Sequence, residues 1–231
     1  MSSSIHQDLQ SQLLQIDNLT FSIASVFLWL AIGTSCFIIF SIIVPLFRNY
    51  ETFQKKAEFV CYFTGMLHAA VSSSLGYYGI YYTCDGWEQG KTPINDEYCL
   101  THPKDIHYKL LLHTAGFLIY DLIIYGALVG AKGTLANQTY IHHVLGASGF
   151  YLTLYTEDVT VLHGVMSLLL EASTVFLDLR WFVYEFKVTN PIIPLLNTGG
   201  LFVAYLSSRV FFQTYISFYI AYPRFYEIWV L

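Results

Sequence analysis

Long apolar runs are the feature that most constrains what this chain can fold into. A helix needs about 20 predominantly apolar residues to cross the roughly 30 Å hydrocarbon layer of a bilayer. Six runs approach or exceed that length, and they cover approximately residues 19–47, 58–82, 107–130, 139–156, 159–181 and 193–221. We therefore predict an all-α fold, a polytopic membrane helix bundle of about six transmembrane helices. The fourth run is the weakest, because it is short and opens with two histidines.

The composition agrees with a membrane protein. Of the 231 residues, 55% are hydrophobic and 12% are charged, and the mean hydropathy is +0.50. Soluble domains carry about 25% charged residues, so this chain cannot cover itself with a water-soluble surface. No segment between the runs is long enough for a separate soluble domain. We predict an N-terminal extramembrane segment over residues 1–18 and a single transmembrane domain over residues 19–231.

Basic residues near the ends of the runs indicate an orientation. The loops on one side hold six Lys and Arg residues, and the loops on the other side hold three. The positive-inside rule assigns the richer side to the cytosol or a matrix-like compartment. Both chain ends then lie on the opposite side, together with the longest loop, from about Thr83 to Ile106.

Charge and motif content exclude several classes of function. The first basic residue is Arg48, so we expect no signal peptide with a basic n-region and place any targeting signal within the chain. The net charge is −5 and no basic cluster is present, which argues against binding to nucleic acid. The sequence has no nucleotide-binding fingerprint, and we predict no cofactor. The expected location is an internal membrane, either the endoplasmic reticulum or the mitochondrial inner membrane.

Two cysteines lie in the long acidic loop. Cys84 and Cys99 are accompanied there by several Asp and Glu side chains. If the loop faces an oxidising compartment, the pair is a candidate disulfide. The alternative is two reduced thiols, and the sequence leaves both open.

Ionisable residues inside the apolar runs are the most informative positions. Each costs a few kcal/mol near the middle of a bilayer, so such groups normally face the bundle interior and pair with one another. We expect them to converge on one interior cavity that binds lipid. The residues predicted to line it are His68, His113, Asp121, His142, His143, His163, Glu171 and Arg209.

Helical spacing places several of these groups on common faces. His163, Ser167 and Glu171 step by four residues, and Asp178 continues that face seven residues later. Arg209 lies on a similar polar stripe in the last run. An unpaired guanidinium there is very costly, so we expect it to pair with Glu171, Asp178 or Asp121.

The polar set has more than one interpretation. Each residue taken singly is most simply a buried hydrogen-bonding group that fixes helix register. Taken together, the set is able to hold a lipid head group, relay a proton or act as a general base. His142 and His143 are adjacent and point about 100° apart on a helix, so we predict no metal site. The sequence alone assigns no catalytic residue.

Several short segments, in order on successive runs, resemble the TLC domain superfamily. They are Met66-Leu67-His68-Ala69, Tyr120-Asp121-Leu122, Ile141-His142-His143-Val144, Glu171-Ala172-Ser173-Thr174 and Leu179-Arg180-Trp181-Phe182. The resemblance extends over about residues 50–220. It implies a six-helix bundle with a central lipid-facing cavity. The superfamily includes ceramide synthases and smaller proteins linked to membrane lipid composition, sensing or trafficking.

The sequence departs from the ceramide synthases at two positions of one motif. In those enzymes the paired histidines are followed by a pattern of the form HDxxDxxLE, whose polar groups are taken to perform acyl transfer. Here the segment from His163 to Glu171 keeps the leading histidine and the final Leu-Glu, but Gly164 and Ser167 replace both aspartates. Acyl transfer needs a base and charge stabilisation close together. We therefore expect this chain not to be a ceramide synthase and lean against enzymatic activity.

Two functions remain as hypotheses. In the first, the protein binds or helps to organise membrane lipids and acts in lipid homeostasis, with membrane lipids as its partners. In the second, it is a non-catalytic accessory subunit of a large membrane complex, for example a mitochondrial respiratory assembly, with other membrane subunits as partners. The sequence names neither the lipid nor the partner subunits.

Overall fold

The computed structural model describes the backbone of residues 2–130, 133–155 and 159–223. Within these ranges it describes all side chains except those of residues 2–16, 134–135, 155, 159 and 221. Every regular element in the described ranges is helical. The predicted all-α membrane bundle is therefore confirmed as a fold class.

Six long helical segments form the described part of the bundle. They are α1 (Ser2–Ile43); α3 (Phe53–Tyr81); α5 (Asp105–Ile124) with the π-helical η2 (Tyr125–Val129); α6 (Thr134–Leu152); α7 (Val159–Ser167) with the 3₁₀ turn η4 (Leu168–Glu171) and α8 (Ala172–Glu185); and α9 (Ile192–Ala204) with the π-helical η5 (Tyr205–Phe212), α10 (Gln213–Tyr215) and the π-helical η6 (Ile216–Ala221). The short elements are α2 (Pro45–Asn49), η1 (Trp87–Gln89), α4 (Glu97–Thr101) and η3 (Thr153–Tyr155).

Local sequence signals explain where several segments begin and end. Pro45 occupies the first turn of α2, where its missing N–H costs nothing. Thr52 caps α3, because its Oγ1 accepts a hydrogen bond from the Lys55 amide at 3.2 Å. Gly130 adopts a left-handed conformation with φ of 61° directly after η2. A glycine ends a helix in this way without steric cost.

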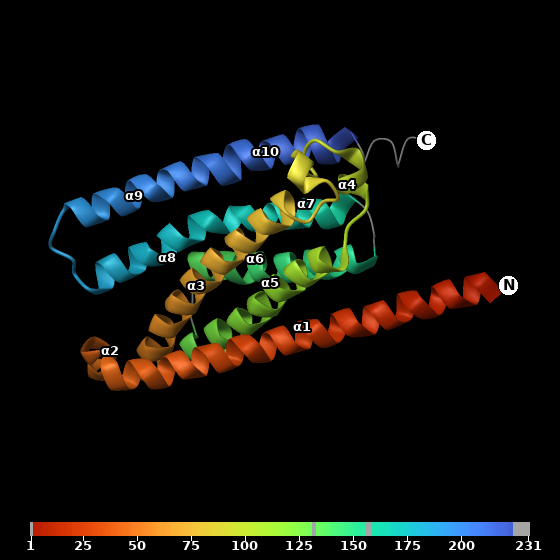
Figure 1. Cartoon of the computed structure of the whole chain (residues 1–231). Helices are drawn as coiled ribbons and strands as arrows, with labels where there is room; N and C mark the ends of the chain where they lie inside the picture. Colours follow the sequence, from red (N-terminus) through yellow and green to blue (C-terminus); the bar gives the residue numbers. More distant parts are fainter. Residues whose placement is uncertain (1, 131–132, 156–158, 224–231) are drawn as a thin grey trace.

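The long segments run side by side (Figure 1). α1 packs on α5, α5 packs on α6 and α3, and α3 packs on α8, which in turn contacts α9. Glycine permits the closest of these approaches, since a Cβ on Gly116 of α5 would lie 2.5 Å from the Cβ of Ser25 on α1. The start of α1, α4 and the end of η6 lie at one end of the bundle, and α2 lies at the other (Figure 1).

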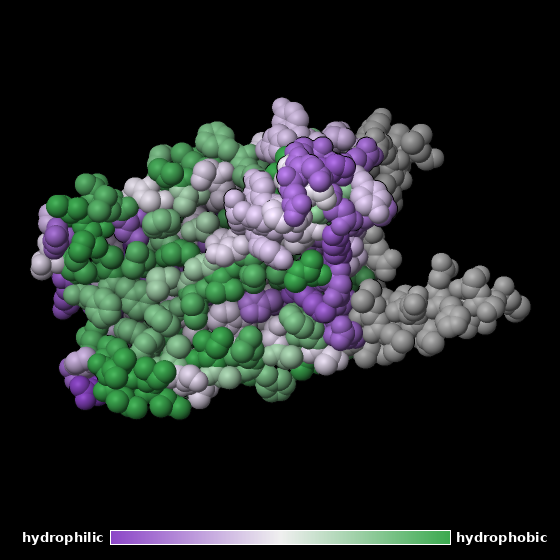
Figure 2. Space-filling model, viewed as in Figure 1, coloured by the Kyte–Doolittle hydropathy of each residue, from purple (hydrophilic) through white to green (hydrophobic). Residues whose placement is uncertain are grey.

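The outer surface of the bundle is apolar, as a bilayer requires. Phe27, Ile42, Leu145 and Phe211 are each 65–68% exposed. In Figure 2 apolar residues cover much of the visible face, and polar residues gather at the end that carries α4. This arrangement is the inverse of a soluble protein, in which large apolar patches are rare.

Three helical segments among the described residues are long and apolar enough to cross a membrane. They are Asp17–Ile43, Asp105–Val129 and Thr160–Glu185. The other three predicted runs coincide with α3, α6 and the segment from α9 to η6, so the total of six spans stays a prediction. α1 begins at Ser2 and continues directly into the first span. The side chains of residues 2–16 lie outside the described part, and the extramembrane location predicted for residues 1–18 is not tested.

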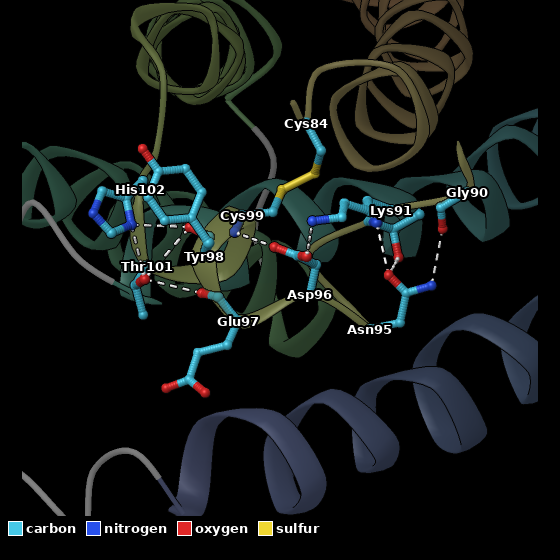
Figure 3. A network of polar contacts seen from close by, with 11 residues as sticks. Cys84, Gly90, Lys91, Asn95, Asp96, Glu97, Tyr98, Cys99, Thr101 and His102 are labelled. Atoms are coloured by element: carbon cyan, nitrogen blue, oxygen red, sulfur yellow. Dashed lines mark hydrogen bonds and ion pairs between the residues drawn. A yellow bond between two sulfur atoms is a disulfide. The ribbon is translucent and has the colours of Figure 1, made fainter. Parts of the chain in front are cut away.

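A compact structure in the long loop joins α3 to α5 (Figure 3). Cys84 and Cys99 form a disulfide with their Cα atoms 5.5 Å apart, and both side chains are buried. Asp96 caps α4 by accepting a hydrogen bond from the Cys99 amide at 2.9 Å, and it also pairs with Lys91 at 2.9 Å. The Lys91 ammonium group and the Cys99 amide hold the pKa of Asp96 below its usual value. The loop is therefore an ordered cap on this end of the bundle.

Candidate functional site

A cavity of about 900 Å³ lies among the helices of the bundle. Residues of α3, α5, η2, α6, η4, α8, α9 and η5 form its wall. Apolar and aromatic side chains that are half or more exposed border its opening, namely Leu177, Tyr184, Phe202 and Tyr205. The cavity therefore reaches the apolar side surface of the bundle.

A smaller cavity of about 330 Å³ adjoins the first one. Leu118, His142, Glu171 and Arg209 border both cavities. The smaller cavity extends from this boundary towards α7, where His163 and Ser167 line it. The predicted polar stripe of His163, Ser167 and Glu171 thus faces one space.

Arg209 is held by hydroxyl groups. Its Nε donates a hydrogen bond to Ser173 Oγ at 2.9 Å, and one terminal nitrogen donates to Thr174 Oγ1 at 3.3 Å. Thr174 in turn donates to Glu171 Oε2 at 3.0 Å. The expected ion pair with Glu171, Asp178 or Asp121 is wrong for the described residues, because no carboxylate oxygen among them lies within 4.0 Å of the guanidinium. Thr174 therefore bridges Arg209 and Glu171.

Irregular helix geometry sets the directions of these side chains. Glu171 is the last residue of the 3₁₀ turn η4, and Arg209 lies inside the π-helical η5. Both geometries change the angle between successive side chains relative to a regular α-helix. Such departures inside helices occur frequently at functional sites.

Asp178 is a second ionisable group of the cavity, and it is buried without a partner among the described residues. Its side chain borders the larger cavity, and the residue is only 8% exposed. Among the described residues it has no hydrogen-bond donor and no basic partner within 4.0 Å. Gly65 of α3 lies directly beside its Oδ2 atom.

Asp121 on α5 and His143 on α6 lie close together without forming a hydrogen bond. His143 Nδ1 lies 3.3 Å from Asp121 Oδ2, and Asp121 is 8% exposed. The ring of the neighbouring His142 lies 5.5 Å from the His143 ring and is tilted by 51°. Within the described part of the chain no three His, Cys, Asp or Glu side chains gather as metal ligands do.

His68 and His113 belong to a buried cluster beside the cavity. The His68 ring stacks on Phe117 with centroids 3.7 Å apart, and its Nε2 bonds to Ser72 Oγ at 2.8 Å. The centroid of the Trp29 ring lies 5.4 Å from that of His68 and 5.6 Å from that of His113. His68 is therefore fixed in place by packing and a hydrogen bond.

The structure brings together most of the predicted site residues. Six of the eight border the larger cavity, namely His68, Asp121, His142, His143, Glu171 and Arg209. His163 borders the smaller cavity, and His113 borders neither of the two. Whether these residues contact a lipid is not tested by their positions, and that role stays a prediction.

The predicted site omitted Asp178, Ser173 and Thr174. Asp178 lies seven residues after Glu171, so regular spacing already placed it on the same face. The two hydroxyl residues carry no comparable signal, since Ser and Thr in a helix usually bond to their own backbone. Their role depends on Arg209, which is more than thirty residues away in the sequence.

The position at which the synthases carry their first aspartate lacks a side chain here and packs tightly against Leu111. A Cβ on Gly164 would lie 3.1 Å from a methyl carbon of Leu111, and Gly164 is buried. Ser167 at the second position donates to the Gly164 carbonyl at 2.6 Å. Neither position supplies a carboxylate to the cavity.

Comparison with models of protein families gives a match. The family model described as the TLC domain matches residues 58–230. No curated protein and no solved structure matches the chain.

Proposed function

This chain belongs to the TLC domain family, and we propose that it binds a membrane lipid in the larger cavity and acts in lipid homeostasis. The observation that carries the proposal is the position of the cavity. Its opening has an apolar border that includes Leu177 and Phe202, and its interior holds charged groups that include Arg209 and Asp178. A lipid has the same division between apolar chains and a polar head group.

The size of the cavity also supports this function. Small-molecule sites are typically about 300–1,000 Å³, apolar for the most part, with a few polar groups that fix orientation. A cavity of about 900 Å³ accommodates a head group with the first part of its chains. The remainder of the chains would extend through the opening into the bilayer.

The proposed location is an internal membrane, with the endoplasmic reticulum ahead of the mitochondrial inner membrane. The Cys84–Cys99 disulfide supports this order, since disulfides persist in oxidising compartments such as the lumen of the endoplasmic reticulum. Co-localisation of the tagged full chain with markers of both membranes tests it.

Native mass spectrometry of the full chain in mild detergent tests lipid binding. We expect a lipid adduct in the wild type, and we expect Thr198→Trp, at the cavity wall, to reduce its occupancy severalfold. Leu195→Trp is the matched control, because Leu195 lies on the same helix but is 71% exposed and outside the cavity. Equal occupancy in the two variants contradicts the assignment of this cavity.

The accessory-subunit hypothesis gives a different result in the same experiment. An accessory subunit needs no accessible cavity, and it would carry a stoichiometric protein partner. A preparation with such a partner and with no lipid adduct decides in favour of that hypothesis.

A further inference from the structure

The charged groups of the larger cavity are incompletely paired. Glu171 accepts a hydrogen bond from Thr174, whereas Asp121 Oδ2 lies 3.3 Å from His143 Nδ1 without forming a hydrogen bond. Arg209 has only hydroxyl partners, and Asp178 has no partner among the described residues. A buried charge without a counter-charge costs several kcal/mol, and a buried carboxyl group avoids that cost by holding its proton. A ligand that brings a negative group to Arg209 and a positive group to Asp178 would satisfy both.

The two groups lie on one wall of the cavity. Arg209 bonds to Thr174, and Thr174 and Asp178 are four residues apart on α8. Residues four apart lie on the same helix face, about 6 Å apart along its axis. The guanidinium group and the Asp178 carboxyl group are thus separated by roughly one helical turn.

We propose that the cavity selects a zwitterionic lipid head group, with its phosphate at Arg209 and its primary amine at Asp178. This assignment rests on the proposed lipid-binding function and names the class of lipid. Guanidinium groups bind phosphate through charge-assisted hydrogen bonds. An ammonium group offers three N–H donors and a positive charge to a carboxylate.

An anionic head group fits this arrangement less well. A phosphate ester of glycerol satisfies Arg209 but brings no positive charge to Asp178. Its phosphate charge is not balanced by an ammonium group, so it brings a net negative charge into a cavity that also holds Glu171. A lipid without phosphate leaves Arg209 with its hydroxyl partners alone. The charge pattern therefore favours phosphatidylethanolamine over phosphatidylglycerol and over diacylglycerol.

The affinities of these three lipids for the full chain in detergent test the proposal. We expect wild-type protein to prefer phosphatidylethanolamine to phosphatidylglycerol by at least about tenfold, the effect of one charge-assisted hydrogen bond. Asp178→Asn should abolish this preference. Arg209→Gln should weaken both phospholipids and leave diacylglycerol unchanged. Asp85→Asn and Arg48→Gln remove exposed charges outside the cavity and should change none of the affinities.

The possible outcomes separate the two proposals. If wild-type protein binds lipids but does not prefer phosphatidylethanolamine, the head-group assignment is overturned and lipid binding stands. If it binds none of the three lipids, the proposed function itself fails. Displacement of the lipid by an equal concentration of glycerophosphoethanolamine, which lacks acyl chains, would show that the ligand is a soluble compound. The wild-type ranking decides these points even if a variant does not fold.

Discussion

Gly65 on α3 lies directly against Asp178 on α8, where a Cβ added to the glycine would stand 2.6 Å from Asp178 Oδ2. A real Cβ does not approach an oxygen atom so closely. The glycine therefore leaves the space that the carboxyl group occupies at the cavity wall. Any larger residue at this position has to displace Asp178 or separate the two helices.

The first prediction follows from this contact. Ala is favoured over Gly by about 0.8–1 kcal/mol in a helix interior, and Gly199→Ala on α9 should show that gain because nothing lies within 4 Å of its added Cβ. Gly65→Ala should show little of this stabilisation, because its Cβ would collide with Asp178. It should also reduce the preference for phosphatidylethanolamine. Thermal unfolding in detergent and the lipid titration measure the two effects. Equal stabilisation by both substitutions would contradict the packing described here.

The second prediction concerns the hydroxyl groups that hold Arg209. Ser173→Ala removes the acceptor of the Nε hydrogen bond, and it should lower the free energy of unfolding by about 1.5 kcal/mol, as expected for a hydrogen bond to a charged group. Ser207→Ala is the control, because Ser207 is exposed and bonds only to backbone carbonyls of its own helix. The proposed role of Ser173 is wrong if the two variants unfold at the same denaturant concentration.

The third prediction is that the purified chain does not form ceramide from acyl-CoA and a sphingoid base. Gly164 and Ser167 stand where the synthases carry aspartates, so neither position supplies a carboxylate to the cavity. Product formation is measured by mass spectrometry, with a ceramide synthase as positive control. Turnover that disappears in His142→Ala or His143→Ala would overturn this expectation.

The fourth prediction concerns the loop between α3 and α5. The Cys84–Cys99 bond spans 15 residues, and a closed loop of that length contributes about 3 kcal/mol in the chain-entropy model. Dithiothreitol should therefore lower the unfolding temperature of the wild type. It should have no effect on the Cys84→Ser, Cys99→Ser double variant, which is already destabilised. Alkylation of all four cysteines in unfolded, unreduced protein would show that the thiols are free.

The sequence predicted the fold class and much of the candidate site. The apolar runs predicted the helices, because the bilayer allows few other structures. The cost of burying charge predicted that His68, Asp121, Glu171 and Arg209 would gather, and all four border one cavity.

The pairing of Arg209 was not predictable in the same way. The cost of an unpaired guanidinium predicted an acid beside Arg209, whereas the structure places hydroxyl groups there. The 3₁₀ turn before Ala172 and the π-helical turns around Arg209 rotate the side chains away from regular spacing. Such turns depend on packing between helices and have no clear signature in the residues themselves.

The π-helical segments have a consequence for how this cavity changes during evolution. A π-helical turn closes its hydrogen bonds one residue later than an α-helical turn, so it is equivalent to an α-helix that has accepted an inserted residue. Deletion of one residue within η5 would leave an unbroken helix and yet turn Arg209 to a new direction relative to Ser173. A change of length inside this helix, without any change in its neighbours, would therefore alter the groups that the cavity presents to a ligand.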